Sequence, residues 1–336
     1  MKQQILNKSI YRRNNYLAQK KIGKPICNDV YMSDFRSGFA CVVGRPNVGK
    51  STLTNQLVGE KIAITSKRPQ TTRHAIRGLV HRVDGQLIIV DTPGVHKPKT
   101  LLGSRLNDVV RETWSEVDVA LFCVPADQKI GPGDTYIAQE LSNATRKPKI
   151  GVVTKLDSAS QADIAERLLE LHDLGKETGC DWQEIIPVSA KTRANLDVLL
   201  NLIIPMLPEG PALYPAGIFT DEPVEKMVAE FIREAALDDL REELPHSLAV
   251  VVESIEPDEE RPADRPLMRI RASIYVERDS QKGIIIGHNG SKLKEIGSIS
   301  RKQIEKLIGM QVFLELHVKI APEWQSDPKE LSKLGF

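Results

Sequence analysis

The residues best suited to chemistry lie in a glycine-containing run at 44–52, which reads GRPNVGKST and follows the apolar stretch FACVV. Its spacing matches G-x-x-x-x-G-K-[ST], in which glycines let backbone N–H groups surround a phosphate at a helix N-terminus. We expect Lys50 to reach the β- and γ-phosphates as a catalytic residue and Ser51 to ligate Mg²⁺. The candidate nucleotide-binding residues here are Gly44, Asn47, Val48, Gly49, Lys50, Ser51 and Thr52.

Two further segments are candidates for the metal and the γ-phosphate. The sequence DTPG begins at Asp91, at the end of an apolar strand, where an acid can hold Mg²⁺ through a water and Gly94 can offer its N–H to the γ-phosphate. The segment ITSKRPQTTRH at 64–74 offers Thr72, with Thr71 as second choice, as a hydroxyl ligand that holds the segment only while triphosphate is bound. We therefore predict metal ligation by Ser51, Thr72 and Asp91, and catalytic roles for Lys50, Thr72 and Gly94.

A base-reading loop is predicted from TKLD at 154–157 together with SAK at 189–191. The Asp157 carboxylate can accept hydrogen bonds from guanine N1 and its 2-amino group, which adenine cannot supply. The aliphatic stem of Lys155 can lie along the base, and the Ala190 N–H can meet guanine O6. These segments add Thr154, Lys155, Asp157, Ser189, Ala190 and Lys191 to the candidate nucleotide-binding residues.

Two positions depart from the usual pattern of such sites. Thr154 stands where Asn commonly ties this loop to the phosphate loop, so we expect nucleotide affinity to fall by about 1 kcal/mol while GTP is still preferred over ATP. Val95 stands where many GTPases place a glutamine that positions water. We therefore expect slow intrinsic hydrolysis that a partner or an ion accelerates, with Asn47 as a candidate ligand for K⁺.

The elements that must position these residues alternate between short apolar strands and amphipathic helices from residue 39 to about 205. This order predicts an α/β domain with a largely parallel sheet and helices on both faces. The runs at 75–81 and 86–91 are joined by a short turn and should form an antiparallel hairpin at one edge. Four prolines and two glycines in 208–223 predict a linker.

A second, α+β domain is expected after this linker, with a helix at about 224–242, two strands, a helix at about 291–308 and a final strand. The sequence GHNG at 287–290 matches the GxxG loop with which KH domains clamp single-stranded nucleotides, ahead of a helix rich in Lys and Arg. The alternative is a helix-capping turn beside a solvated basic face. The candidate RNA-binding residues are Lys282, Ile286, Gly287, His288, Asn289, Gly290, Lys292 and Lys294.

The composition excludes several other classes of protein. Lys and Arg number 46 against 45 Asp and Glu, so no global basic field indicates a nucleic-acid partner and a local patch is needed. The four cysteines are scattered and contain no CxxC pair, which argues against a zinc site and for a reducing compartment. No apolar run approaches the roughly 20 residues of a membrane span, and no secretory signal is evident. We expect a cytoplasmic protein.

The first 31 residues form a basic segment of their own, with seven Lys or Arg and one Asp. We favour a disordered extension over a nucleic-acid-binding arm, and Met32 is an alternative start. The expected domains are an extension at 1–37, a GTPase domain at 38–208, a linker at 209–222 and a KH domain at 223–336.

Taken together, GRPNVGKST, ITSKRPQTTRH, DTPG, SAK and IIIGHNG resemble the Era family of bacterial GTPases, over about 35–336. The resemblance implies a Ras-like P-loop GTPase domain joined to a type II KH domain, with GTP or GDP and Mg²⁺ as cofactors and K⁺ as a further candidate. It also implies binding near the 3′ end of 16S ribosomal RNA, a role in assembly of the small ribosomal subunit and some peripheral membrane association. No DNA partner is expected.

The function expected from the sequence is a GTP-hydrolysing, RNA-binding switch. One alternative is an RNA-binding scaffold whose nucleotide site binds without turnover, since Val95 and Thr154 depart from the common pattern. The other is a membrane-attached signalling GTPase that uses its basic surface for lipid head groups.

Overall fold

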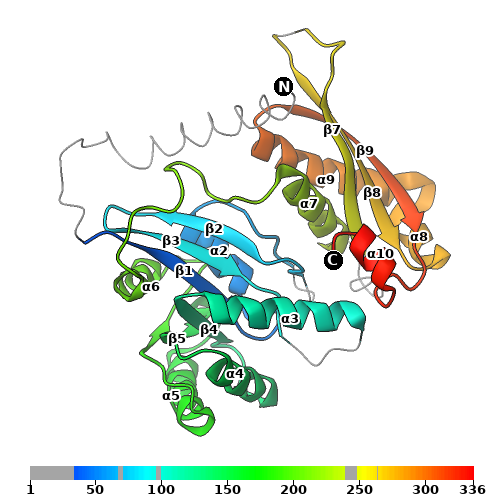
Figure 1. Cartoon of the computed structure of the whole chain (residues 1–336). Coiled ribbons are helices and arrows are strands. Elements are labelled where there is room, and N and C mark those ends of the chain that lie inside the picture. Colours follow the sequence, from blue (N-terminus) through cyan, green and yellow to red (C-terminus); the bar gives the residue numbers. More distant parts are fainter. Residues whose placement is uncertain (1–33, 67–70, 96–99, 239–247, 263) are drawn as a thin grey trace.

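The computed structural model of the chain describes residues 34–66, 71–95, 100–238, 248–262 and 264–336. The basic segment at 1–31 and most of the expected extension at 1–37 lie outside these residues. Two bodies of secondary structure are evident in Figure 1, one built around a six-stranded sheet and one around a three-stranded sheet.

The first sheet has the strand order β2-β3-β1-β4-β5-β6. All neighbours pair in parallel except β2 and β3, which form the predicted antiparallel hairpin at one edge. Every residue of β3, β4 and β5 is buried, as expected for strands covered on both faces. The strands are β1 (Arg36–Val43), β2 (Ile76–His81), β3 (Gly85–Asp91), β4 (Val119–Pro125), β5 (Lys149–Thr154) and β6 (Glu184–Pro187).

Helices cover both faces of this sheet, which confirms the predicted α/β fold. Apolar residues of α2 (Lys50–Val58) and α6 (Leu196–Ile203) pack on one face. Those of α3 (Leu101–Glu116), α4 (Pro132–Ala144) and α5 (Gln161–Thr178) pack on the other. Two short 3₁₀ turns, η1 (Leu156–Ser158) and η2 (Ile204–Met206), follow β5 and α6.

The proline-rich segment at 208–223 lies along the edge of this sheet. The buried Gln86 side chain of β3 accepts hydrogen bonds from the backbone N–H groups of Leu213 and Tyr214, at 2.7 and 2.9 Å. The Leu79 N–H of β2 donates to the Phe219 carbonyl at 2.9 Å. The segment predicted as a linker therefore has a defined course on the GTPase side.

The second body has the strand order β7-β8-β9, with an antiparallel and a parallel pairing, and α7 and α9 pack their apolar faces on it. Two helices, α8 and α10, were not predicted, and within α8, which contains the run KGIII, only Ile285 is fully buried. The elements are α7 (Val224–Asp238), β7 (Ala249–Pro257), β8 (Leu267–Val276), α8 (Asp279–Ile286), η3 (His288–Gly290), α9 (Ser291–Ile308), β9 (Gln311–Ile320) and α10 (Pro328–Lys333).

The two bodies are in contact along α3 of the first. The end of the chain around α10 lies beside the N-terminal half of α3 in Figure 1, where the fully buried Trp324 packs against Leu102 and Leu106. The Leu102 N–H donates to the Gln325 carbonyl at 3.0 Å. Within the described ranges, no helix is both long and apolar enough to cross a membrane.

Candidate functional site

The glycine-containing run forms the turn between β1 and α2. Gly49 ends this turn with φ at 98°, a left-handed conformation that favours glycine, and Asn47 is also left-handed with φ at 64°. Lys50 is buried, and its ammonium donates to the carbonyl oxygens of Gly44 and Arg45 at 3.0 and 2.9 Å. Burial lowers the pKa of Lys50, while the nearby Asp91 carboxylate acts in the opposite direction. The cation is thus held inside the loop where a polyphosphate would bind.

The three predicted metal ligands come together beside this loop. The Ser51 Oγ and Thr72 Oγ1 atoms are 2.9 Å apart, and Thr72 Oγ1 is 3.4 Å from Asp91 Oδ2. Two neighbouring ligands of an octahedral Mg²⁺ at 2.0–2.1 Å would be separated by about 2.9 Å. Asp91 Oδ1 is buried and has no hydrogen-bond partner among the described residues, and burial raises the pKa of Asp91 to about 6. This set of oxygen atoms fits a Mg²⁺ ion.

Gly94, three residues after Asp91, lines the nucleotide cavity beside the phosphate loop. A Cβ atom added to Gly94 would lie 2.8 Å from the Pro46 nitrogen, so the two backbones approach more closely than any other residue type allows. The Val95 side chain is buried in the core between the sheet and α3–α5. It therefore lies away from solvent and has no polar atom with which to orient a water molecule.

The predicted base-reading residues meet at the ends of β5 and β6. The Ser189 hydroxyl donates to Asp157 Oδ1 at 2.6 Å, and the Lys191 ammonium lies 3.7 Å from Asp157 Oδ2. The hydrogen bond from Ser189 is the main cause that lowers the pKa of Asp157. Lys155 is left-handed with φ at 60°, and its ammonium lies 3.7 Å from the Asp127 carboxylate. The Asp157 carboxylate is thus held ionised, as a guanine acceptor must be.

Thr154 connects the base loop to the phosphate loop despite its short side chain. Its hydroxyl donates to the Val48 carbonyl at 2.5 Å and lies 3.3 Å from the Val124 carbonyl. The side chain is buried. The sequence predicted a weaker tie between the two loops because Thr154 replaces an asparagine, and the hydroxyl does contact the phosphate loop.

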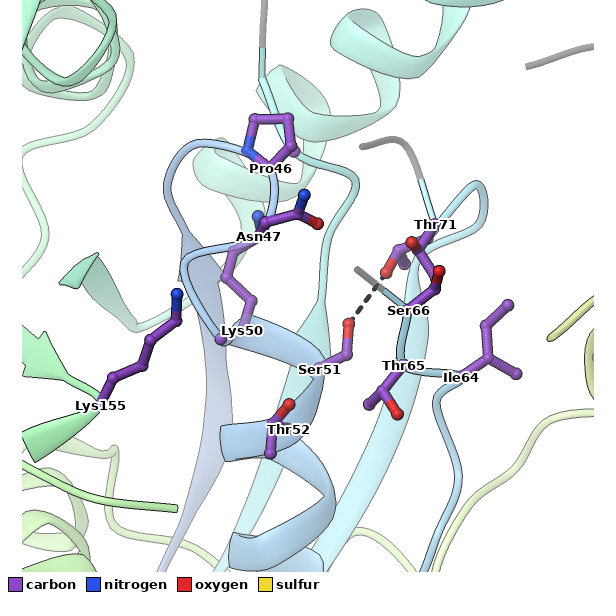
Figure 2. A pocket seen from close by; sticks show the side chains of 13 residues that line it. Pro46, Asn47, Lys50, Ser51, Thr52, Ile64, Thr65, Ser66, Thr71 and Lys155 are labelled. Atoms are coloured by element: carbon purple, nitrogen blue, oxygen red, sulfur yellow. Dashed lines mark hydrogen bonds between the residues drawn. The ribbon is translucent and has the colours of Figure 1, made fainter. Parts of the chain in front are cut away.

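Figure 2 shows the cavity that these elements enclose, with Lys50 between Lys155 on one side and Ser51 and Thr71 on the other. Its volume is about 580 Å³, enough for the phosphates and sugar of a nucleotide. Asp157 and Ser189 are not among its lining residues, so the base end lies beyond it. It is lined by Pro46, Asn47, Gly49, Lys50, Ser51, Thr52, Ile64, Thr65, Ser66, Thr71, Thr72, Gly94 and Lys155.

The predicted RNA-binding loop joins α8 to α9. Gly287 has φ at 69° and ψ at 178°, a region open essentially only to glycine, and a Cβ atom there would lie 2.8 Å from Lys292 Cγ. Gly290 caps α9 in the left-handed region with φ at 75°. His288 and Asn289 are exposed at the tip. The N-terminus of an 18-residue helix follows directly, which favours an anionic ligand at the loop.

A groove of about 470 Å³ continues from this loop between α9 and β9. Two predicted residues, Gly290 and Lys294, line it, whereas Lys282, Ile286, Gly287, His288, Asn289 and Lys292 do not. The other lining residues are Leu293, Gly297, Ser298, Arg301, Phe313, Leu314 and Leu316. The alternation of apolar residues along 311–320 could have indicated the contribution of β9, but GxxG spacing alone could not.

Two protein-family models match the sequence. Residues 39–155 match a family described as 50S ribosome-binding GTPase. Residues 243–325 match a KH domain. Each match falls on one of the two bodies. The first includes the phosphate loop, Thr72 and Asp91 but ends before the base-reading residues Asp157 and Ser189, and the second includes the GxxG loop.

Curated relatives match almost the whole chain. GTPase Era of Streptomyces coelicolor is 62% identical over 90% of this chain and 95% of its own length. GTPase Era of Mycolicibacterium smegmatis is 58% identical over 91% of this chain and all of its own length. Both bodies are therefore shared with these proteins.

Two solved structures match over about the same share of the chain as these relatives do. A crystal structure of Era in complex with MgGDPNP and nucleotides 1506–1542 of 16S ribosomal RNA has a TM-score of 0.84 and 37% identity, covering 90% of this chain and 99% of that one. A structure of an Aquifex aeolicus Era variant bound to GDP and AlF₄⁻ also has a TM-score of 0.84 and 37% identity, covering 89% of this chain and 99% of that one. The similarity thus includes the arrangement of both bodies.

Proposed function

The chain belongs to the Era family of GTPases, and we propose that it is a GTP-driven switch that binds 16S ribosomal RNA and acts in assembly of the small ribosomal subunit. The observation that carries this proposal is the similarity along both bodies to an Era chain in complex with MgGDPNP and a 16S ribosomal RNA fragment. Both surfaces needed for these ligands have a counterpart here, namely the cavity beside α2 and the groove beside α9.

In this proposal, Lys50 and the backbone N–H groups of the phosphate loop bind the β- and γ-phosphates. Ser51, Thr72 and Asp91 would hold Mg²⁺, which neutralises charge on the phosphates when bound. Thr72 and Gly94 would meet the γ-phosphate side and so be sensitive to hydrolysis. Support comes from the 2.9 Å separation of the two hydroxyl oxygens and from the buried Asp91 oxygen atom without a hydrogen-bond partner among the described residues.

Guanine selection is assigned to Asp157, held by Ser189 and Lys191, with the Ala190 N–H as the donor for guanine O6. The lowered pKa of Asp157 supports this role because only the carboxylate form accepts two hydrogen bonds from guanine. Thr154 and Lys155 would support the base loop from the phosphate-loop side.

Slow intrinsic hydrolysis is proposed because Val95 is buried and apolar. Asn47 lines the nucleotide cavity, and we assign its side chain as a candidate K⁺ ligand beside the phosphates. The test is to measure hydrolysis with K⁺ and with Na⁺ at equal ionic strength. Equal rates would remove this role for Asn47.

The proposed domain boundaries are those expected from the sequence, with the GTPase domain at 38–208, the linker at 209–222 and the KH domain at 223–336. They are supported by three apolar clusters, two on the first sheet and one on the second, which Ile64 joins from the first domain. A cytoplasmic location is proposed because the RNA in the related complex is ribosomal. Salt-dependent binding to liposomes that exceeds RNA binding would instead favour the membrane-attached alternative.

Two measurements test the two halves of the proposed function. GTP hydrolysis by the full chain is measured with and without an RNA of the 3′ end of 16S ribosomal RNA, and bound RNA is crosslinked in cells with and without Gly287→Asp. We expect turnover in vitro and crosslinks to 16S RNA that the variant loses. Binding without turnover in either condition would favour the scaffold alternative, and unchanged crosslinks would contradict the role of the loop.

A further inference from the structure

The segment that carries Thr72 is held from both ends by two consecutive residues of α7. At its beginning, the Thr65 N–H donates to Glu234 Oε1 at 2.9 Å, and the Thr65 hydroxyl lies 3.4 Å from the same oxygen. Ile64 is buried in the apolar core of the second body. The Lys61 ammonium donates to Glu234 and, at 3.1 Å, to Gln303. Lys61, Ile64 and Thr65 therefore contact the KH side of the molecule, whereas Ile62 and Ala63 between them pack in the core of the first sheet.

At the other end of the segment, the Arg233 guanidinium donates to the Thr71 carbonyl. Arg233 is only 2% exposed and is paired with Glu230 one turn earlier, with Nε 2.9 Å from Oε1. Burial alone would raise the pKa of Glu230, but Arg233, together with His74 and Arg73, lowers it. The pair is therefore ionised, and the strength of a charged hydrogen bond is applied to a backbone carbonyl next to Thr72.

The two residues after Thr72 are anchored as well. The buried Arg73 donates to the Leu248 carbonyl at 2.6 Å, and its guanidinium lies over the rings of Trp324 and Phe336 at 5.6 and 5.8 Å. The His74 ring stacks on Phe336 with centroids 5.0 Å apart. All of these anchoring groups lie outside the GTPase domain. Thr72 is thus flanked on both sides by residues that the second body holds.

The Thr72 side chain itself contacts the nucleotide site, where its hydroxyl is hydrogen-bonded to Ser51 and lies near Asp91. We propose that Arg233 and Glu234, supported by Glu230, are positioning residues that set Thr72 for Mg²⁺ and triphosphate binding. This inference rests on the proposed metal role of Thr72. It means that part of the GTPase site is built by the KH side of the chain, because a hydroxyl that is already in place adds no ordering cost when the ligand binds.

The reciprocal consequence concerns RNA. α7 packs against α9, which forms one wall of the groove, through the shared core that includes Phe231, Ile232, Ile296 and Ile304. A ligand that favours one position of α7 would change triphosphate affinity, and triphosphate would change affinity for that ligand by the same factor. GDP has no γ-phosphate to engage Thr72, so GDP affinity should not depend on the contacts that Arg233 and Glu234 make with the residues before Thr72.

The test measures the Mg²⁺ concentration that half-saturates binding of a non-hydrolysable GTP analogue, and separately of GDP, to the full chain. The principal variant is Glu230→Gln with Arg233→Met, which removes both charges so that neither is left buried alone. Glu234→Ala is a second, milder variant. Arg111→Ala is the matched control, because this arginine pairs with Glu140 on the surface between α3 and α4. Thr72→Ala marks the effect of losing the ligand itself.

We expect the double variant to raise the half-saturating Mg²⁺ for the GTP analogue by roughly tenfold, the effect of one charged hydrogen bond. GDP binding should change by less than about twofold in the same preparation, which also shows that the site is folded. Glu234→Ala should shift the analogue in the same direction by about threefold. Arg233→Lys, with Glu230 kept, should show a smaller loss than the double variant, because Lys keeps the charge but not the fork of donors.

Two results would overturn the proposal. If Thr72→Ala raises the half-saturating Mg²⁺ while the double variant and Glu234→Ala behave like Arg111→Ala, Thr72 is a ligand but α7 does not position it. If Thr72→Ala leaves the Mg²⁺ titration unchanged as well, Thr72 is not a metal ligand, and the positioning role of Arg233 and Glu234 is excluded with it.

Discussion

The nucleotide cavity and the GxxG loop both offer backbone N–H groups at a helix N-terminus, but they are built differently. At the nucleotide site the functional side chains are bonded to one another, as Ser51 with Thr72 in the cavity and Asp157 with Ser189 beyond it. At the GxxG loop, the tip residue His288 is exposed. The backbone of this loop is fixed instead, because Gly287 adopts a conformation that essentially only glycine allows. One site depends on which side chains are present, and the other depends on a backbone shape.

This difference fits the two proposed ligands. A nucleotide is small and rigid, so buried donors and acceptors can be set for each of its groups before it arrives. A single RNA strand is long and flexible, and its phosphates can be met by exposed cations and a preformed turn. We therefore expect side-chain changes in the cavity to have larger effects than side-chain changes at the loop.

The largest effect is expected for Lys50→Met, which removes the only buried ammonium that lies within the phosphate loop among the described residues. Affinity for GTP should fall by about a hundredfold or more, since charged contacts with two phosphates are lost at once. Equilibrium binding of a fluorescent GTP analogue measures the change. A loss of less than about fivefold would mean that the loop binds phosphate chiefly through its backbone, as the GxxG loop is proposed to do.

A backbone test of the second site is expected to have the next largest effect. Gly287→Asp should weaken binding of the 16S 3′-end RNA by at least about tenfold, because any side chain strains this conformation and a carboxylate also repels phosphate. Gly287→Ala separates the two causes, since it adds strain without charge. RNA affinity is measured by filter binding, and nucleotide affinity is the control. If Ala is tolerated and only Asp is harmful, charge rather than backbone shape governs the loop.

A smaller effect is expected at the base-reading residues, which lie beyond the cavity. Ser189→Ala removes the 2.6 Å hydrogen bond to Asp157 and should weaken GDP binding by about fivefold to tenfold. It should also move the loss of GDP affinity at acid pH to a higher pH, because the bond that lowers the Asp157 pKa is gone. Ser158→Ala is the matched control, since that hydroxyl is exposed and 3.4 Å from Asp157. Equal behaviour of both variants would show that Asp157 is not preset by Ser189.

The comparison also explains what the sequence could predict. Phosphate and Mg²⁺ dictate residue types at fixed spacing, so Lys50, Ser51 and Asp91 could be identified together with the strands that end at them. The fold class followed from the alternation of apolar strands and amphipathic helices. The helix at 279–286 was missed because KGIII shows neither period clearly.

The contacts between the two bodies could not be predicted, for a physical reason. Arg233 lies 162 positions from Thr71 in the sequence, and Glu234 lies 169 positions from Thr65. On its own, α7 has an ordinary amphipathic pattern in which a Glu and an Arg one turn apart indicate only a surface ion pair. Their burial depends on the docking of a second body, and no local pattern records that.

The smallest effect, and the sharpest test of how the cavity is preset, is expected at Thr154. Thr154→Val keeps the shape but removes the hydroxyl that bonds the Val48 carbonyl, so GDP affinity should fall by about fivefold, or roughly 1 kcal/mol. Thr154→Asn should strengthen GDP binding by up to about the same amount, because an amide adds a second donor toward the phosphate loop. Both variants should keep GTP preferred over ATP, since Asp157 is unchanged. A weaker Asn variant beside a weaker Val variant would mean that the buried hydroxyl already fits this position better than the amide does.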